Sequence, residues 1–152
     1  MLVIIRDTRE QDCENGRLDF SGIEEVDKVE DMGLAYGDYT AIINEKSVPI
    51  IWERKSKSDL WGTLFSDEYQ RFKRELARAK EANVKLILTI EGTYTDIWAG
   101  FEYSKFDGQA MMKKLATLYV KYDLEYVFNE SRRVMARRIV DCYSAIQRNY
   151  ST

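Results

Sequence analysis

Two carboxylates and one lysine stand at the ends of two neighbouring β-rich runs of the sequence. Asp38 precedes the run at 39–43, while Glu53 and Lys55 follow the run at 48–52, and a short polar segment separates the runs. This pattern is typical of a β-hairpin, which would bring the three side chains to one end of a sheet. Phosphodiester hydrolysis uses such a set. Carboxylate oxygens hold Mg²⁺, the ion lowers the pKa of water, and a cation positions the nucleophile.

The convergence of these side chains depends on the hairpin register. A connecting loop with an even number of residues, centred between Glu45 and Lys46, pairs Ile43 with Val48 and Asp38 with Glu53. Lys55 then lies on the same side as Glu53, because side chains alternate along a strand with period two. A three-residue loop would shift the register by one and place the two carboxylates on opposite faces.

Two further acids stand close to this group in the sequence. Asp7 follows the apolar run at 2–5, and it would add a third carboxylate if that strand neighbours the hairpin. Asp59 lies six residues beyond Glu53, at the start of a predicted helix. An acid in the first turn of a helix is also favoured by the helix dipole, so Asp59 has two interpretations.

The composition excludes several classes of chemistry. The chain has no histidine, which rules out Ser-His-Asp triads, histidine-ligated zinc and histidine-based nucleases. Hydrolytic chemistry must therefore rest on carboxylates and lysine. Cys13 and Cys142 are too few for a disulfide framework and fit a reducing compartment. The first apolar run is too short for a signal sequence or a membrane span, so we expect a cytoplasmic protein without an organic cofactor or membrane partner.

The periodicity of apolar residues predicts one α/β domain over residues 1–152, with a mixed central sheet flanked by helices. A strand at 84–90 and another at 124–128, separated by a helix, indicate a parallel crossover. The expected elements are a strand at 2–5, a loop at 11–22, a short edge strand at 23–29, the hairpin, a helical turn at 60–64, helices at 67–82 and 107–123, and a last helix after Ser131.

The net charge of −3 conceals a gradient along the chain. Residues 1–50 carry 5 basic and 12 acidic side chains, whereas residues 51–152 carry 18 and 14. A polyanion would meet the second part, although scattered surface charge explains the same numbers. We expect phosphate contacts on the helix at 67–82, from Arg71, Arg74 and Arg78. A second basic cluster on the last helix fits a solvated face, and its contact with DNA stays open: Arg132, Arg133, Arg137 and Arg138.

Three motifs occur in order along the chain: Asp-x-Arg-Glu at 7–10, Gly-Asp-Tyr at 37–39 and Glu-Arg-Lys-x-x-x-Asp at 53–59. Together they resemble the nuclease domain of the XPF-type structure-selective endonucleases, within the PD-(D/E)xK superfamily. The order of helices and strands extends the resemblance over nearly the whole chain. It implies a restriction-endonuclease-like core and metal-dependent DNA cleavage that leaves a 5′-phosphate and a 3′-hydroxyl.

The resemblance also implies roles for individual residues. Asp38 and Glu53 would be Mg²⁺ ligands, with Mn²⁺ able to substitute, and Asp7 would be a further acidic ligand. Lys55 would orient or deprotonate the attacking water. The remaining matches, in which arginines would hold phosphate and an acid would support the site, are Arg9, Arg54 and Asp59.

Unlike the repair-type members of the family, this chain is expected to have no tandem helix-hairpin-helix module after the nuclease domain. The expected substrate is branched or nicked DNA such as a flap or fork, and a dimeric Holliday-junction resolvase is the alternative within the same class. A non-catalytic DNA-binding or dimerisation subunit is the alternative from another class. The resemblance favours a homodimer or heterodimer. The expected location is the cytoplasm, nucleoid-associated or in a host cell if viral, and the nucleus if eukaryotic.

Overall fold

The computed structural model describes residues 1–10 and 16–150. Within them, seven strands form one mixed sheet in the order β2-β1-β3-β5-β6-β7, with β4 paired to β3. Strand β2 is parallel to β1, strand β3 is antiparallel to β1 and β5, and β5, β6 and β7 are parallel. The strands are β1 (Leu2–Asp7), β2 (Lys28–Met32), β3 (Tyr39–Ile43), β4 (Lys46–Ser47), β5 (Ile50–Lys55), β6 (Lys85–Glu91) and β7 (Glu125–Asn129).

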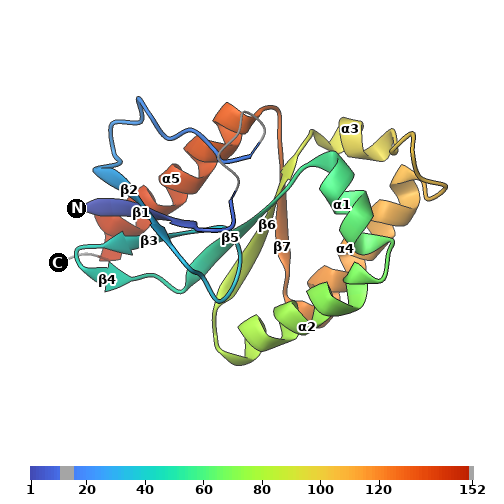
Figure 1. Cartoon of the computed structure of the whole chain (residues 1–152), viewed down its shortest axis with the longest axis horizontal. Helices are drawn as coiled ribbons and strands as arrows, with labels where there is room; N and C mark the ends of the chain where they lie inside the picture. Colours follow the sequence, from blue (N-terminus) through green and yellow to red (C-terminus); the bar gives the residue numbers. More distant parts are fainter. Residues whose placement is uncertain (11–15, 151–152) are drawn as a thin grey trace.

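Five helices cover the sheet in the described residues: α1 (Lys57–Leu64), α2 (Glu68–Glu81), α3 (Tyr94–Trp98), α4 (Gly108–Tyr122) and α5 (Arg132–Tyr150). Figure 1 shows α5 beside β1 and β3, and α1, α2 and α4 grouped on the other side of the molecule. The alternation along β6 separates two cores, since Leu86 and Leu88 pack with α1, α2 and α4 whereas Ile87 packs with α5. The predicted mixed sheet flanked by helices is confirmed.

The hairpin register is correct at the site and wrong at the turn. Asn44 and Glu45, both at positive φ, form a two-residue turn that pairs Ile43 with Lys46 rather than with Val48. Farther along, Tyr39 pairs with Trp52, as predicted. Residues 48–51 therefore oppose only residues 40–41, and the strand bulges. An excess of two residues preserves the alternation of faces, so the end of β5 keeps its predicted orientation.

The first edge strand is shifted from its predicted place. Residues 23–27 form turns and coil in which Ile23 and Val26 pack against the core, and the strand begins only at Lys28. The Asp27 carboxylate accepts a 2.6 Å hydrogen bond from Leu2 N–H, which ends the turn region beside β1. Cys13 and part of the predicted loop lie outside the described residues. Cys142 is a free, half-buried thiol on α5.

Helix α3 follows β6 and has no counterpart in the predicted elements. It is five residues long, too short for apolar periodicity to reveal it. Its local signal is a capping box, in which the side chains of Thr93 and Asp96 each bind the other's backbone N–H. None of the described helices is both long enough and apolar enough to cross a membrane.

Candidate active site

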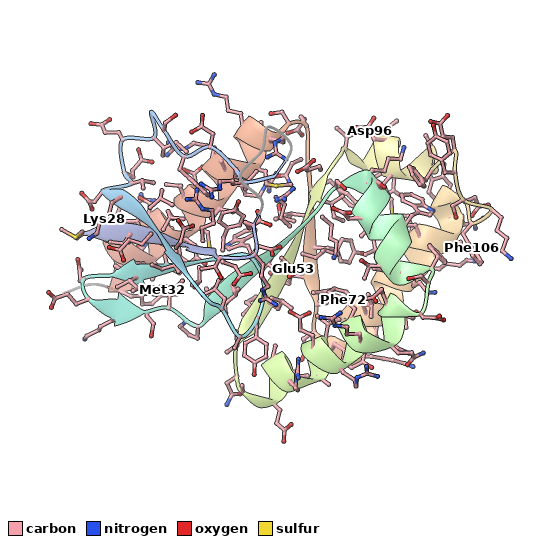
Figure 2. The ribbon with its side chains drawn as sticks, viewed as in Figure 1. Lys28, Met32, Glu53, Phe72, Asp96 and Phe106 are labelled. Carbon is pink, nitrogen blue, oxygen red and sulfur yellow. The ribbon has the colours of Figure 1, made fainter. Side chains whose placement is uncertain are left out.

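A cavity of about 240 Å³ opens at one end of the central strands, where β1 and β5 end and β3 begins. Asp7, Arg9, Asp38, Glu53 and Lys55 reach it from these strands. Helices α1 and α2 close the other side, and the lining there consists of Thr63, Glu68, Arg71, Phe72 and Glu75. Figure 2 shows Glu53 near the centre of the molecule, with Phe72 of α2 on the neighbouring side. The convergence predicted from the hairpin register is thus observed.

Asp38 is held by the backbone of the strand opposite. Its carboxylate accepts a 2.7 Å hydrogen bond from Arg54 N–H, and its own N–H donates to Trp52 C=O at 2.8 Å. Asp7 N–H donates to Asp38 C=O at 2.8 Å, which ties the end of β1 to the same point. Burial raises the pKa of Asp38, and the negative charge of Glu10 raises it further.

Glu53 and Lys55 lie on the same side of β5, as their spacing predicts. The Lys55 ammonium is 3.6 Å from the Glu53 carboxylate and 5.9 Å from the centre of the Phe72 ring. Burial raises the pKa of Glu53, and the charge of Asp38 adds to this rise. Lys55 offsets only part of the effect. The two carboxylates therefore form a buried anionic pair with one ammonium beside it, which favours binding of a further cation.

Asp7 is buried and fully engaged with the protein. One oxygen accepts from Arg9 Nε at 2.7 Å and from Arg9 N–H at 3.3 Å, and the other accepts from Leu34 N–H at 2.9 Å. Burial alone would raise the pKa of Asp7, but these hydrogen bonds outweigh it and the net pKa is lowered. Asp7 has fewer free lone pairs for a metal than Asp38 and Glu53. Its clearest role is to hold Arg9, whose side chain is 69% exposed at the cavity.

Arg54 does not face the cavity, in contrast to the expected phosphate contact. Its guanidinium is 9% exposed and lies between Glu10, at 3.1 Å, and Glu91, at 2.8 Å. Glu10 also accepts a 2.7 Å hydrogen bond from the Tyr39 hydroxyl, and Arg132 donates to Glu91 at 2.6 Å. Because the backbone N–H of Arg54 binds Asp38, this buried network fixes the position of a candidate metal ligand.

Of the remaining predicted site residues, one lines the cavity and the others lie outside it. Arg71 is exposed, lines the cavity and lies 3.6 Å from Glu68. Arg74 and Arg78 are exposed on α2 but do not line it. Asp59 is also exposed and outside the cavity, in the first turn of α1, where the helix-dipole interpretation accounts for it.

Glu75 is the site residue that the sequence reasoning missed. It reaches the cavity from α2 and accepts a 3.3 Å hydrogen bond from Gly37 N–H, next to Asp38. Its charge contributes to the raised pKa of Glu53. A signal was present in the spacing, because Glu68, Phe72 and Glu75 recur at i, i+4 and i+7 and so share one face of a helix. Of the three arginines predicted on this helix, Arg71 shares the face of Glu75 at the cavity, whereas Arg74 and Arg78 do not line it.

The donor set fits a divalent cation such as Mg²⁺. Two buried carboxylates supply hard oxygen ligands, and their pKa values are raised by burial and then by neighbouring negative charge, which a bound cation would offset. In the described residues, no three acidic, histidine or cysteine side chains are arranged closely enough to coordinate one ion by themselves. Mg²⁺ usually binds through one or two carboxylates together with water and substrate phosphate, which agrees with this pair.

A mixed sheet between helices, with an acidic pair and a lysine at the edge where β5 ends, defines the restriction-endonuclease-like class of nuclease folds. The family model of the ERCC4 domain matches residues 6–142, and the chain belongs to that family, one of structure-specific DNA endonucleases. No curated protein matched the sequence.

Two solved structures have a similar fold. XPF from Aeropyrum pernix superposes with a TM-score of 0.70 at 19% identity, over 98% of this chain and 67% of that one. XPF from Aeropyrum pernix in complex with DNA gives a TM-score of 0.68 at 19% identity, over 100% and 68%. This likeness confirms the expected fold.

Proposed function

We propose that this chain is a divalent-metal-dependent DNA endonuclease that hydrolyses phosphodiester bonds and leaves a 5′-phosphate and a 3′-hydroxyl. The observation that carries the proposal is the buried pair of Asp38 and Glu53 beside Lys55 in one cavity. Membership of the ERCC4 domain family supports it. Mg²⁺ is the proposed cofactor, with Mn²⁺ as a substitute.

Each residue of the cavity has a defined task in this mechanism. Asp38 and Glu53 would hold the cation, which when bound supplies Lewis acidity toward water and neutralises charge on the phosphate. Lys55, whose ammonium lies beside Glu53, would orient the attacking water by donating a hydrogen bond to it. Arg9 extends from Asp7 into the cavity, where its exposed guanidinium can bind a phosphate oxygen.

The proposed substrate is branched or nicked DNA, such as a flap or a replication fork. The open cavity at a sheet edge admits a backbone phosphate without requiring a base to enter. The DNA complex of the Aeropyrum pernix XPF supports DNA as the ligand class. A dimeric resolvase acting on four-way junctions would use the same cavity twice, with symmetrical paired nicks as its product pattern.

The test is cleavage of a labelled panel containing linear duplex, single strand, flap, fork and four-way junction, with Mg²⁺, Mn²⁺ or EDTA. We expect metal-dependent cuts by the wild type, and a loss of at least about 100-fold in Glu53→Gln and in Lys55→Ala. Glu81→Gln, an exposed change at the other end of α2, is the control and should cut normally.

The preferred member of the panel distinguishes flap cleavage from junction resolution. Binding of DNA without any cleavage under all metal conditions would refute the endonuclease and favour a non-catalytic subunit. Full activity of both Glu53→Gln and Lys55→Ala would remove this cavity from the reaction.

A further inference from the structure

Two lysines from different helices converge on one tyrosine beside the candidate active site. The Lys73 ammonium of α2 lies 4.6 Å from the centre of the Tyr69 ring, and the Lys114 ammonium of α4 lies 4.2 Å from the same centre. Lys114 also lies 4.3 Å from the centre of the Phe65 ring, which stacks on Phe106. All of these groups except Phe106 are half-buried. We call Tyr69, Lys73 and Lys114 the lysine–tyrosine cluster.

The cluster carries positive charge that the described part of the protein does not balance. Neither lysine forms an ion pair with a carboxylate in residues 1–10 and 16–150. Burial lowers the pKa of Lys114, and the neighbouring charge of Lys73 lowers it further. The effect of Lys73 on Lys114 shows that the two charges repel each other, and an anion bound beside both ammonium groups would reduce this repulsion.

The charges on the two helices that carry the cluster are predominantly positive. Helices α2 and α4 together contain eight lysines and arginines against three glutamates, and α4 contains no acid. Strand β2, from the acidic first third of the chain, lies on the other side of the molecule from these helices in Figure 1. A polyanion approaching the cavity would therefore pass over α2 and α4.

The position of the cluster suits contact with a DNA strand whose backbone also enters the cavity. Helix α2 presents Phe72 and Glu75 to the cavity, and Tyr69 and Lys73 lie about one third of a turn round the same helix, at 100° per residue. A helix with its side chains is about 10 Å across. With ~3.4 Å of rise per nucleotide along one strand, this separation corresponds to roughly three nucleotides.

We propose that the lysine–tyrosine cluster is a second phosphate-binding site, which holds the DNA backbone roughly three nucleotides from the phosphate in the cavity. The inference rests on the proposed function and identifies how the nuclease domain grips its substrate. Lys73 and Lys114 contact phosphate oxygens, and the Tyr69 ring holds the two ammonium groups in place by cation–π contact.

The experiment measures binding of a fluorescein-labelled flap duplex in EDTA, by anisotropy, at NaCl concentrations from about 50 to about 200 mM. We expect the double variant Lys73→Gln/Lys114→Gln to bind about tenfold more weakly at the low-salt end. The slope of log binding constant against log salt concentration should also become less steep by about two. The double variant Lys73→Arg/Lys114→Arg should restore both values.

A matched control removes the same charge elsewhere. The double variant Lys80→Gln/Lys85→Gln breaks exposed pairs with Asp123 and Glu125, and it should keep the wild-type slope. An unchanged affinity and slope in Lys73→Gln/Lys114→Gln, with or without a lower melting temperature, would overturn the inference and leave the cluster as a packing contact. Equal weakening by both glutamine pairs would also overturn it, because net charge alone would explain the result.

Failure of the proposed function looks different. If the wild type neither cleaves nor binds the flap duplex, the endonuclease proposal fails first. If the wild type cleaves with Mg²⁺ and the glutamine pair binds normally, only the cluster proposal fails.

Discussion

Glu53 illustrates the conflict between stability and function within a single residue. Its side chain is 13% exposed, next to Asp38, and its folded-state pKa is raised above the ordinary value of 4.5. Ionisation of Glu53 therefore costs the folded state more than the unfolded chain. Without metal, the free energy of unfolding should decrease as pH rises from about 4.5 through the raised pKa.

Replacing Glu53 by glutamine removes this cost. We expect Glu53→Gln to melt roughly 2–4 °C higher than the wild type at neutral pH in EDTA, which corresponds to about 1 kcal/mol. The advantage should disappear below the ordinary glutamate pKa, and Mg²⁺ should raise the melting temperature of the wild type only. Calorimetric scans of both proteins across pH provide the measurement, with Glu81→Gln as control. A variant that melts at or below the wild type at every pH would contradict the burial argument.

The sequence correctly predicts the convergence of those site residues whose positions follow from local rules. Asp38, Glu53 and Lys55 converge because the alternation along two paired strands determines their faces. The sequence did not predict the partners of Arg54, because Glu10 and Glu91 reach it from the ends of different strands. Such contacts depend on the order of strands in the sheet, for which no local pattern exists. The catalytic roles remain predictions.

At the scale of elements, the connection that leads through Asp38 into β3 has a glycine at position 37 for a specific reason. Gly37 adopts φ +66°, and a Cβ there would lie 2.5 Å from Ile51 Cγ2 and 3.0 Å from Trp52 C=O. Its N–H also donates to Glu75. Any other residue would be strained in the left-handed region and would push the start of β3 away from β5.

Gly37→Ala should therefore destabilise the fold and disturb the candidate metal ligand beside it. We expect a loss of about 1–3 kcal/mol in the free energy of unfolding and weaker Mg²⁺ binding, measured by urea titration and calorimetry. Gly33→Ala is the matched control, because a Cβ at Gly33 meets nothing within 4 Å in the same connection. Equal stability of the two variants would mean that the close approach at Gly37 carries no cost.

The hairpin shows how far element-level prediction extends. The residues Asn44 and Glu45 indicate the turn only once the connection is known to be two residues long. The bulge at 48–51 includes Pro49, which has no N–H to donate to the neighbouring strand. Hydrogen bonds from the Thr40 hydroxyl to Ile50 C=O, at 3.0 Å, stabilise the bulged strand. The prediction succeeded at the site because an excess of two residues leaves the faces unchanged.

At the scale of the whole molecule, the edge of the sheet opposite β2 presents apolar surface to solvent. Strand β7 forms this edge of the described sheet, with Tyr126 and Val127 half-buried on it. Next to it on α4, Tyr119 is 57% exposed and Val120 is 76% exposed. The apolar and aromatic side chains of the last helices suit either a core or a dimer interface, and only the arrangement of elements separates the inward residues from these outward ones.

We expect this edge to bind a second copy of the chain, because exposed apolar surface next to an edge strand favours association of proteins. Sedimentation should give twice the chain mass of 17.9 kDa at high protein concentration. Val120→Asp should shift the equilibrium toward the monomer by about tenfold or more in the dissociation constant. Met32→Asp, an exposed apolar change on β2 at the other edge, should leave association unchanged. If the wild type stays monomeric at every concentration, the expected dimer is wrong, and the cavity must act from a single chain.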